Sequence, residues 1–150
     1  MTVWIDRDRA FVARRYDHLA RLITLFEWLL FVPGKFREQA VAALDLKPGD
    51  RVLEIGCGTG RNLPALRAAV GDTGHVYGID LSAGMLTRAR SLVDRHQWRN
   101  VTLVHGDAVD YQAPEPLDGV LFGFSYSKCL IITRSFYRHW RSCGQAAASA

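Results

Sequence analysis

Three glycines at alternate positions lie between a short apolar run and a stretch able to form a helix. They are Gly56, Gly58 and Gly60, and the run before them carries one acidic residue, Glu54. This pattern predicts a strand, a tight turn and a helix start. Because glycine has no Cβ, a ligand can lie against the turn's peptide groups, and the helix start adds unpaired N–H groups. The stretch predicts a site for a nucleotide-like ligand, with a plain structural turn as the alternative.

The spacing of these glycines does not fit the Gly-x-Gly-x-x-Gly fingerprint of dinucleotide-binding proteins. Counted from Gly56, the third glycine position holds Arg61, and counted from Gly58 it holds Leu63. The Glu54 carboxylate is also a poor neighbour for a pyrophosphate, but it suits a ligand with an ammonium and a sulfonium, because opposite charges attract strongly where water is scarce. The stretch resembles motif I of the class I S-adenosylmethionine (SAM)-dependent methyltransferases.

Asp80 is a second acidic residue at the end of an apolar run, 24 residues after Gly56. An acidic side chain at such a strand end can accept hydrogen bonds from two ribose hydroxyls. Bonds of this kind are worth roughly 1.5–3 kcal/mol each. The alternative is that Asp80 merely precedes a helix whose N-cap is Ser82.

The string from Gly78 to Leu86 resembles methyltransferase motif II. This resemblance implies that Leu81 and Met85 flank the adenine of the cofactor. Met85 also fits the apolar stripe of the predicted helix Ser82 to His96, so a core position is its alternative.

A third acidic residue, Asp107, follows the predicted strand Val101 to His105. In the resembling family an acidic residue here accepts a hydrogen bond from the adenine amino group, and the backbone N–H of the next residue, Ala108 in this chain, meets a ring nitrogen. Gly-Asp after a strand is also a common turn, so this element only supports the other two. His105 is predicted to be a core histidine rather than a base.

The resemblance implies further cofactor contacts from Cys57, in the glycine turn, and from Phe124, at the end of the fourth predicted strand. Tyr16 begins a Tyr-Asp-x-x-Ala sequence. It resembles the segment that covers the SAM and substrate pocket in ubiquinone and menaquinone C-methyltransferases, and a core or surface tyrosine is the alternative. The catalytic residues stay unknown: Tyr16, His18 and Tyr126 are candidates for a base, which only some acceptors need. No metal site is predicted.

Alternating strands and helices must bring these residues together. Helices are expected at Asp6–Val32, Lys35–Leu44, Asn62–Val70 and Ser82–His96, and strands before Gly56 and at His75–Asp80, Val101–His105 and Asp118–Phe124. This succession predicts an α/β fold with a doubly wound, mostly parallel sheet of order 3-2-1-4, the Rossmann-like fold that the resemblance also implies. Three parts are expected: a helical cap (1–34), a SAM-binding core (35–127) and an atypical basic tail (128–150).

The composition is that of one globular domain, with 150 residues, 49% hydrophobic and 23% charged. The net charge of +4 comes from four basic residues after Ser127, because the remaining 15 basic residues equal the 15 acidic ones. Nucleic acid is therefore not an expected partner, although the aromatic and basic tail leaves nucleic acid or a membrane as a weaker alternative. Three cysteines without metal-ligand spacing, and no signal-peptide pattern, favour the cytoplasm.

The first predicted helix has an apolar stripe with flanking arginines. Its apolar run, Leu22 to Val32, is interrupted by Glu27 and is too short to span a bilayer. It could lie in a membrane interface as a peripheral contact. Packing of the helix on its own domain is the favoured explanation.

The resemblance ends near Ser127, where the family continues through a helix, a Pro-Gly-Gly-type turn and three more strands. Without them the fourth strand would be a long apolar edge with unpaired backbone groups. Cys129 to Thr133 could fold back onto that edge, or a second subunit could cover it in a homodimer. The favoured hypothesis is a truncated or frame-shifted chain that is unstable.

Together these patterns predict a SAM-dependent methyltransferase acting on a small-molecule or lipid-like acceptor, such as a quinone, an isoprenoid or a phospholipid headgroup. The end of the fourth strand lacks the Asn/Asp-Pro-Pro-Tyr sequence of many DNA and glutamine N-methyltransferases, which argues against those substrates. One alternative is a catalytically inactive SAM-binding fragment or pseudo-enzyme. Another is a nicotinamide-dependent oxidoreductase, which Arg61 and Leu63 disfavour.

Overall fold

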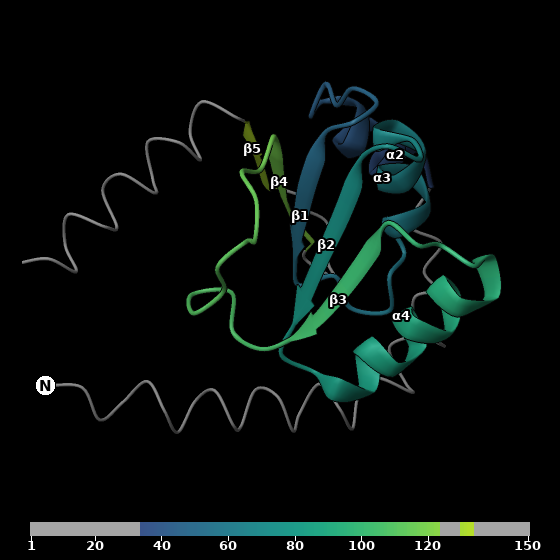
Figure 1. Cartoon of the computed structure of the whole chain (residues 1–150), viewed down its shortest axis with the longest axis vertical. Helices are drawn as coiled ribbons and strands as arrows, with labels where there is room; N and C mark the ends of the chain where they lie inside the picture. The colour runs from purple at the N-terminus through teal and green to yellow at the C-terminus, as the bar shows by residue number, and fades with distance from the viewer. Residues whose placement is uncertain (1–33, 124–129, 134–150) are drawn as a thin grey trace, which may run out of the picture.

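The computed structural model describes residues 34–123 and 130–133, a β-sheet with helices packed against it (Figure 1). The elements, labelled as in Figure 1, are α2 (Gly34–Ala42), β1 (Arg51–Ile55), α3 (Leu63–Val70), β2 (His75–Asp80), α4 (Ala83–His96), β3 (Val101–His105), β4 (Gly119–Phe122) and β5 (Leu130–Thr133). The predicted first helix and most of the predicted tail lie outside these residues, so the division into cap, core and tail stays a prediction. None of the helices in the described ranges has the length and apolar character needed to cross a membrane.

The strands follow the order β3-β2-β1-β4-β5. β1 pairs in parallel with β2 and β4, and β2 pairs in parallel with β3, which confirms the predicted order 3-2-1-4. The three middle residues of β1, Val52, Leu53 and Glu54, are all buried because both faces of this central strand are covered. The carboxyl ends of β1, β2 and β3 therefore meet along one edge of the sheet, where ligands bind in doubly wound folds.

β5 corrects the prediction of an exposed edge. It runs antiparallel to β4, with Leu130 opposite Phe122 and Thr133 opposite Gly119. The fold-back of Cys129 to Thr133, one of the three alternatives for this edge, is therefore confirmed for residues 130–133. Among the described residues β5, not β4, is therefore the edge of the sheet on this side, and a homodimer stays a prediction.

The core lies on both faces of the sheet. Successive residues of a strand point to opposite faces, so Val52 joins the apolar cluster beneath the helices and Leu53 joins the cluster on the other face. The helix-side cluster contains Ala40, Val41, Leu44, Leu63, Leu66, Val70 and Ala89 against Val52, Val76 and Leu121. Glu54 follows Val52 by two positions, so its carboxyl faces the helix layer.

The starts of α3 and α4 agree with the sequence signals. Pro64 lies in the first turn of α3, and the side chain of Ser82 caps α4 by accepting a hydrogen bond from the Met85 N–H at 3.2 Å. Gln97 ends α4 in the left-handed conformation, with φ of 54°. Both helices therefore begin at the edge where β1 and β2 end.

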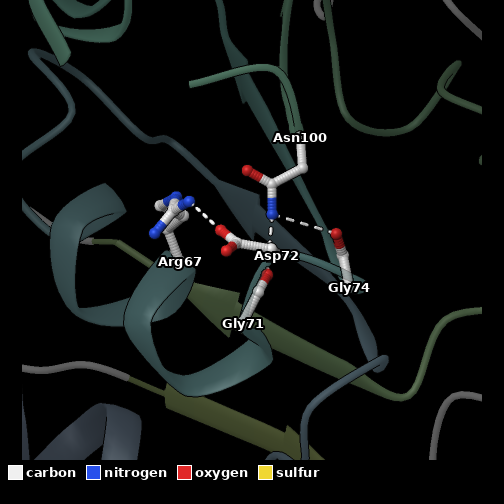
Figure 2. A network of polar contacts seen from close by, with 5 residues as sticks. All are labelled: Arg67, Gly71, Asp72, Gly74 and Asn100. Atoms are coloured by element: carbon white, nitrogen blue, oxygen red, sulfur yellow. Dashed lines mark hydrogen bonds and ion pairs between the residues drawn. The ribbon is translucent and has the colours of Figure 1, made fainter. Parts of the chain in front are cut away.

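Asn100 holds the turn between α3 and β2. Its Nδ2 donates to the carbonyl oxygens of Gly71 at 2.8 Å and Gly74 at 3.0 Å, and Figure 2 shows the amide nitrogen between these two groups. Arg67 forms an ion pair with Asp72 in the same turn (Figure 2). The network fixes where β2 begins, at the end of the sheet opposite to Asp80.

Asn100→Ala should lower the free energy of unfolding by about 1–3 kcal/mol, because two carbonyl groups lose their donor. Urea denaturation measures this change. Arg99→Ala, a substitution of the exposed neighbouring side chain, is the control and should change the free energy by less than about 0.5 kcal/mol. Equal effects of the two substitutions would contradict the role assigned to Asn100.

Candidate functional site

The loop between β1 and α3 is tied to the end of β2. The N–H groups of Gly56 and Cys57 both donate to the Ile79 carbonyl, at 2.8 and 3.1 Å, and the Gly60 N–H donates to the Cys57 carbonyl at 2.9 Å. Gly56, Gly58 and Gly60 have φ of 71°, 54° and 82°, a region that residues with side chains rarely adopt. The predicted tight turn is confirmed, and it lies at the carboxyl edge of the sheet.

Gly58 and Gly60 lack side chains for different structural reasons. A Cβ at Gly60 would lie 2.7 Å from Leu63 Cδ1 and 3.3 Å from Ala89 Cβ, because α3 and α4 pack closely against the loop there. A Cβ at Gly58 would meet no atom of the described residues within 4 Å. Packing therefore explains Gly60, whereas Gly58 borders open space that a ligand can occupy.

Gly60→Ala should destabilise the fold by about 1–2 kcal/mol more than Gly58→Ala. Both substitutions place a side chain in the left-handed region, which costs about 1–2 kcal/mol, but only Gly60→Ala also crowds Leu63 and Ala89. Urea denaturation of the two variants measures the difference. An equal loss of stability would show that Gly60 is not packed as the structure has it.

Asp80 ends β2, and its carboxylate joins two segments of the chain. Oδ2 accepts a hydrogen bond from the Gly58 N–H at 2.7 Å, and Oδ1 accepts one from the Ser82 N–H at 2.8 Å. Asp80 does precede a helix capped by Ser82, which was the alternative to a ligand-binding role for this residue. A ligand-binding role is compatible with these bonds, because a carboxylate offers about four lone-pair positions. Asp80 is half-buried and lies beside Gly58, the glycine that borders open space.

Glu54 is 1% exposed, and only one of its carboxyl oxygens has a partner among the described residues: Oε1 accepts a hydrogen bond from Asn62 Nδ2 at 2.6 Å. Burial raises the pKa of this carboxyl from 4.5 to about 8; the Asn62 bond opposes the rise, the Asp80 charge adds to it and the Arg37 charge opposes it. A buried carboxyl oxygen without a donor is unfavourable. Glu54 is therefore suited to receive a cationic group of a ligand.

The end of β3 lies beside the end of β2. The Gly106 N–H donates to the Asp80 carbonyl at 3.1 Å, and the half-buried Asp107 comes next and accepts a hydrogen bond from the Val109 N–H at 2.9 Å. Ala108 packs against the apolar cluster on the second face of the sheet. Asp80 and Asp107 thus follow neighbouring strands at the same edge, as predicted.

The prediction that His105 belongs to the core was wrong. Its ring is exposed and Nε2 donates to the Leu81 carbonyl at 3.0 Å, because β3 is an edge strand whose end faces solvent. Leu81 is 36% exposed, which leaves its side chain accessible to a ligand, whereas Met85 is 5% exposed and agrees with its core alternative. Cys57 is buried, and burial raises the pKa of its thiol.

Several predicted site residues lie outside the described part of the chain. They are Tyr16 and Phe124, expected at the cofactor, and the base candidates His18 and Tyr126. Their roles stay predictions. Within residues 34–123 and 130–133, no group of three or more His, Cys, Asp or Glu side chains is placed to hold a metal ion.

Three residues at the site were not predicted from the sequence. Asn62 bonds to Glu54, although an asparagine before a helix normally indicates a cap. Gly123 follows β4, and a Cβ there would lie 2.8 Å from Glu54 Oε1. Arg37, in α2, is close enough for its charge to lower the pKa of Glu54. Only Asn62 carried a usable signal, its position eight residues after Glu54 at the start of the helix that follows the loop.

Comparison with known proteins decides the family. A family profile described as a methyltransferase domain matches residues 52–144. The chain belongs to the class I SAM-dependent methyltransferases. The matched region begins in β1 and includes the glycine loop, Asp80 and Asp107. Membership removes the oxidoreductase alternative, and SAM is the cofactor of this family.

Curated relatives of this methyltransferase domain include demethylmenaquinone methyltransferases from two bacteria. The protein from Geobacillus sp. (strain WCH70) is 33% identical over 114 residues, which cover 75% of this chain and 47% of the relative. The protein from Symbiobacterium thermophilum is 32% identical over 133 residues, which cover 87% of this chain and 51% of the relative. The chain thus spans about half the length of these relatives.

Solved structures similar to the domain also include methyltransferases. A SAM-dependent methyltransferase from Aquifex aeolicus superposes with a TM-score of 0.54 at 30% identity, over 60% of this chain and 48% of that one. One from Thiobacillus denitrificans, solved with S-adenosyl-L-homocysteine (SAH), gives a TM-score of 0.52 at 29% identity, over 60% and 36% of the two chains. These similarities agree with the parallel sheet described above.

Proposed function

We propose that the chain binds SAM at the carboxyl edge of its sheet and transfers the methyl group to a small-molecule or lipid-like acceptor. The observation that carries the proposal is the meeting of three features at one loop. Gly58 lies beside open space, Asp80 is bonded to that glycine, and the buried Glu54 has a carboxyl oxygen without a partner among the described residues. Bare backbone between two acidic groups suits an adenosine derivative with positive charge. Membership of the family supports the same ligand.

Each residue of the site has a proposed partner on SAM. Asp80 accepts hydrogen bonds from the ribose hydroxyls, and the exposed side chain of Leu81 lies against the adenine. Asp107 accepts from the adenine amino group and the Ala108 N–H meets a ring nitrogen, as the family resemblance implies. Glu54 balances the charge of the ammonium group.

SAM brings an already activated methyl group, so the chemistry is a displacement at that carbon. The task of the protein is then to align the acceptor atom, the methyl group and the sulfur, an effect able to supply several kcal/mol. The rigid ties between the loop and the end of β2, through Ile79 and Asp80, keep the cofactor side of this alignment fixed. A base, where the acceptor needs one, is proposed among Tyr16, His18 and Tyr126.

A quinone is the first candidate for the acceptor. The names of the curated relatives, which are demethylmenaquinone methyltransferases, support this choice. The apolar first predicted helix and the Tyr16 segment support an apolar acceptor, with an isoprenoid or a phospholipid headgroup as the other candidates. Contact of that helix with a membrane surface would bring the site to such molecules, and the cytoplasmic location stays a prediction.

Calorimetric titration with SAM and SAH tests the first half of the proposal. Transfer of labelled methyl groups from SAM to a demethylated quinone tests the second half, with single-stranded RNA as the control acceptor. We expect both ligands to bind and the label to enter only the quinone. Failure of both ligands to bind would overturn the proposal, and binding without transfer to any acceptor would identify a SAM-binding protein that does not catalyse methylation.

A further inference from the structure

Asn62 occupies the N-cap position of α3 without acting as a cap. Asparagine is among the residues most favoured at this position, because its side chain can accept a hydrogen bond from a free N–H of the first turn. Its side chain makes no such bond here. Instead, Nδ2 donates to Glu54 Oε1 at 2.6 Å, and both residues are buried, at 9% and 1% exposure. The Asn62 side chain thus bonds to Glu54 instead of capping α3.

Two buried oxygen atoms of this pair have no partner among the described residues. They are Glu54 Oε2 and Asn62 Oδ1. Buried acceptors are normally hydrogen-bonded, because leaving them unpaired costs their hydration. Two such acceptors on hydrogen-bonded neighbours point to a ligand with several donors. An ammonium group has three N–H donors, no acceptor and a charge opposite to that of a carboxylate.

We propose that Asn62 and Glu54 together receive the ammonium group of SAM, with Asn62 Oδ1 and Glu54 Oε2 as its two buried acceptors. This inference rests on the proposed function, and it makes Asn62 a recognition residue for the amino-acid half of the cofactor. Its bond to Oε1 also orients the carboxyl group, so that the second oxygen is left for the ligand.

The arrangement couples cofactor binding to the loss of a proton. Receiving a cation requires an ionised Glu54, whereas burial, together with the charge of Asp80, raises the pKa of this carboxyl to about 8 against the opposing effects of Asn62 and Arg37. Near pH 7 the free protein therefore carries a proton on Glu54 that the ammonium displaces into solvent. Affinity for SAM should rise as the pH increases toward 8, because fewer molecules then have a proton to lose.

The test compares two ligands on wild-type protein and on Asn62→Ala. SAH keeps the ammonium group without the sulfonium charge, and 5′-methylthioadenosine keeps the adenosine and the sulfur without the amino-acid part. Asn62→Ala should weaken the binding of SAH by about tenfold or more and change the affinity for methylthioadenosine by less than about twofold. Asn100→Ala makes the same chemical change at the opposite end of the sheet and should leave both affinities unchanged.

An equal loss of affinity for both ligands would show that Asn62 only shapes the loop, and no loss of affinity would show that Asn62 does not contact the cofactor. Either result overturns the inference. A second measurement needs no variant. Calorimetry near pH 7 in phosphate and in Tris should give close to one proton released per SAM or SAH bound, and none per methylthioadenosine. Equal proton release for all three ligands would also overturn it, whereas failure of all three to bind would overturn the proposed function itself.

Discussion

Glu54→Gln is expected to prevent most of the loss of stability that the wild-type protein undergoes as the pH rises from 5 to 9. The pKa of Glu54 is raised from 4.5 to about 8 in the folded protein, chiefly by burial. Between these two values the folded state holds a proton that the unfolded state has released. The free energy of unfolding should therefore fall by about 1.4 kcal/mol per pH unit across this window. Glutamine has no proton to lose, so the variant lacks this slope.

Urea denaturation followed by circular dichroism at pH 5, 7 and 9 measures the effect. Below pH 5 the two proteins should have similar stabilities, because the wild-type carboxyl is then neutral like the amide of the variant. By pH 9 Glu54→Gln should be more stable than wild type by about 4 kcal/mol, from the same slope. Other titrating groups are common to both proteins and cancel in the comparison. Parallel pH profiles would mean that Glu54 is not buried as a neutral group.

Asp80→Ala is expected to weaken the binding of SAM by about tenfold or more. Loss of the carboxylate removes its proposed hydrogen bonds to the ribose, worth roughly 1.5–3 kcal/mol each. It also releases the N–H groups of Gly58 and Ser82, held at 2.7 and 2.8 Å, so the glycine loop becomes less well fixed. SAH and 5′-methylthioadenosine both contain the ribose, and calorimetry should therefore show an equal loss for the two ligands.

Two further variants control this prediction. Asp80→Asn keeps one acceptor oxygen and should bind with an affinity between those of wild type and Asp80→Ala. Asp94→Ala removes an exposed carboxylate from α4 and should bind like wild type. If Asp80→Ala itself binds SAM as tightly as wild type, the carboxylate serves only to hold the loop and the ribose contact is wrong.

The parts of the fold that could be predicted are those with local signals. The glycine turn, Pro64 and Ser82 mark element ends by backbone chemistry, and the structure places α3 and α4 within one residue of the predicted starts. Parallel pairing followed from strands that alternate with helices, and the order 3-2-1-4 from the resemblance to a Rossmann-like fold. Asp80 and Asp107 could be placed at one edge for the same reason, because parallel strands end on the same side.

The parts that could not be predicted depend on contacts between distant segments. The four residues of β5, three of them apolar, carry no signal for the strand that they pair with or for an antiparallel register. His105 was misplaced because only its position in an edge strand, a property of the whole sheet, exposes it. The bond from Asn62 to Glu54 competes with ordinary capping, and burial decides between the two.

The central claim is that SAM lies against the bare loop beside Asp80, at the carboxyl edge of the sheet. Amide chemical-shift mapping by NMR during titration with SAH tests it most directly. We expect the largest shifts at Gly56, Gly58, Leu81 and Ala108, and none at Gly74 and Asn100 at the opposite end. Large shifts around Gly74 and Asn100, with Gly58 unaffected, would contradict the account.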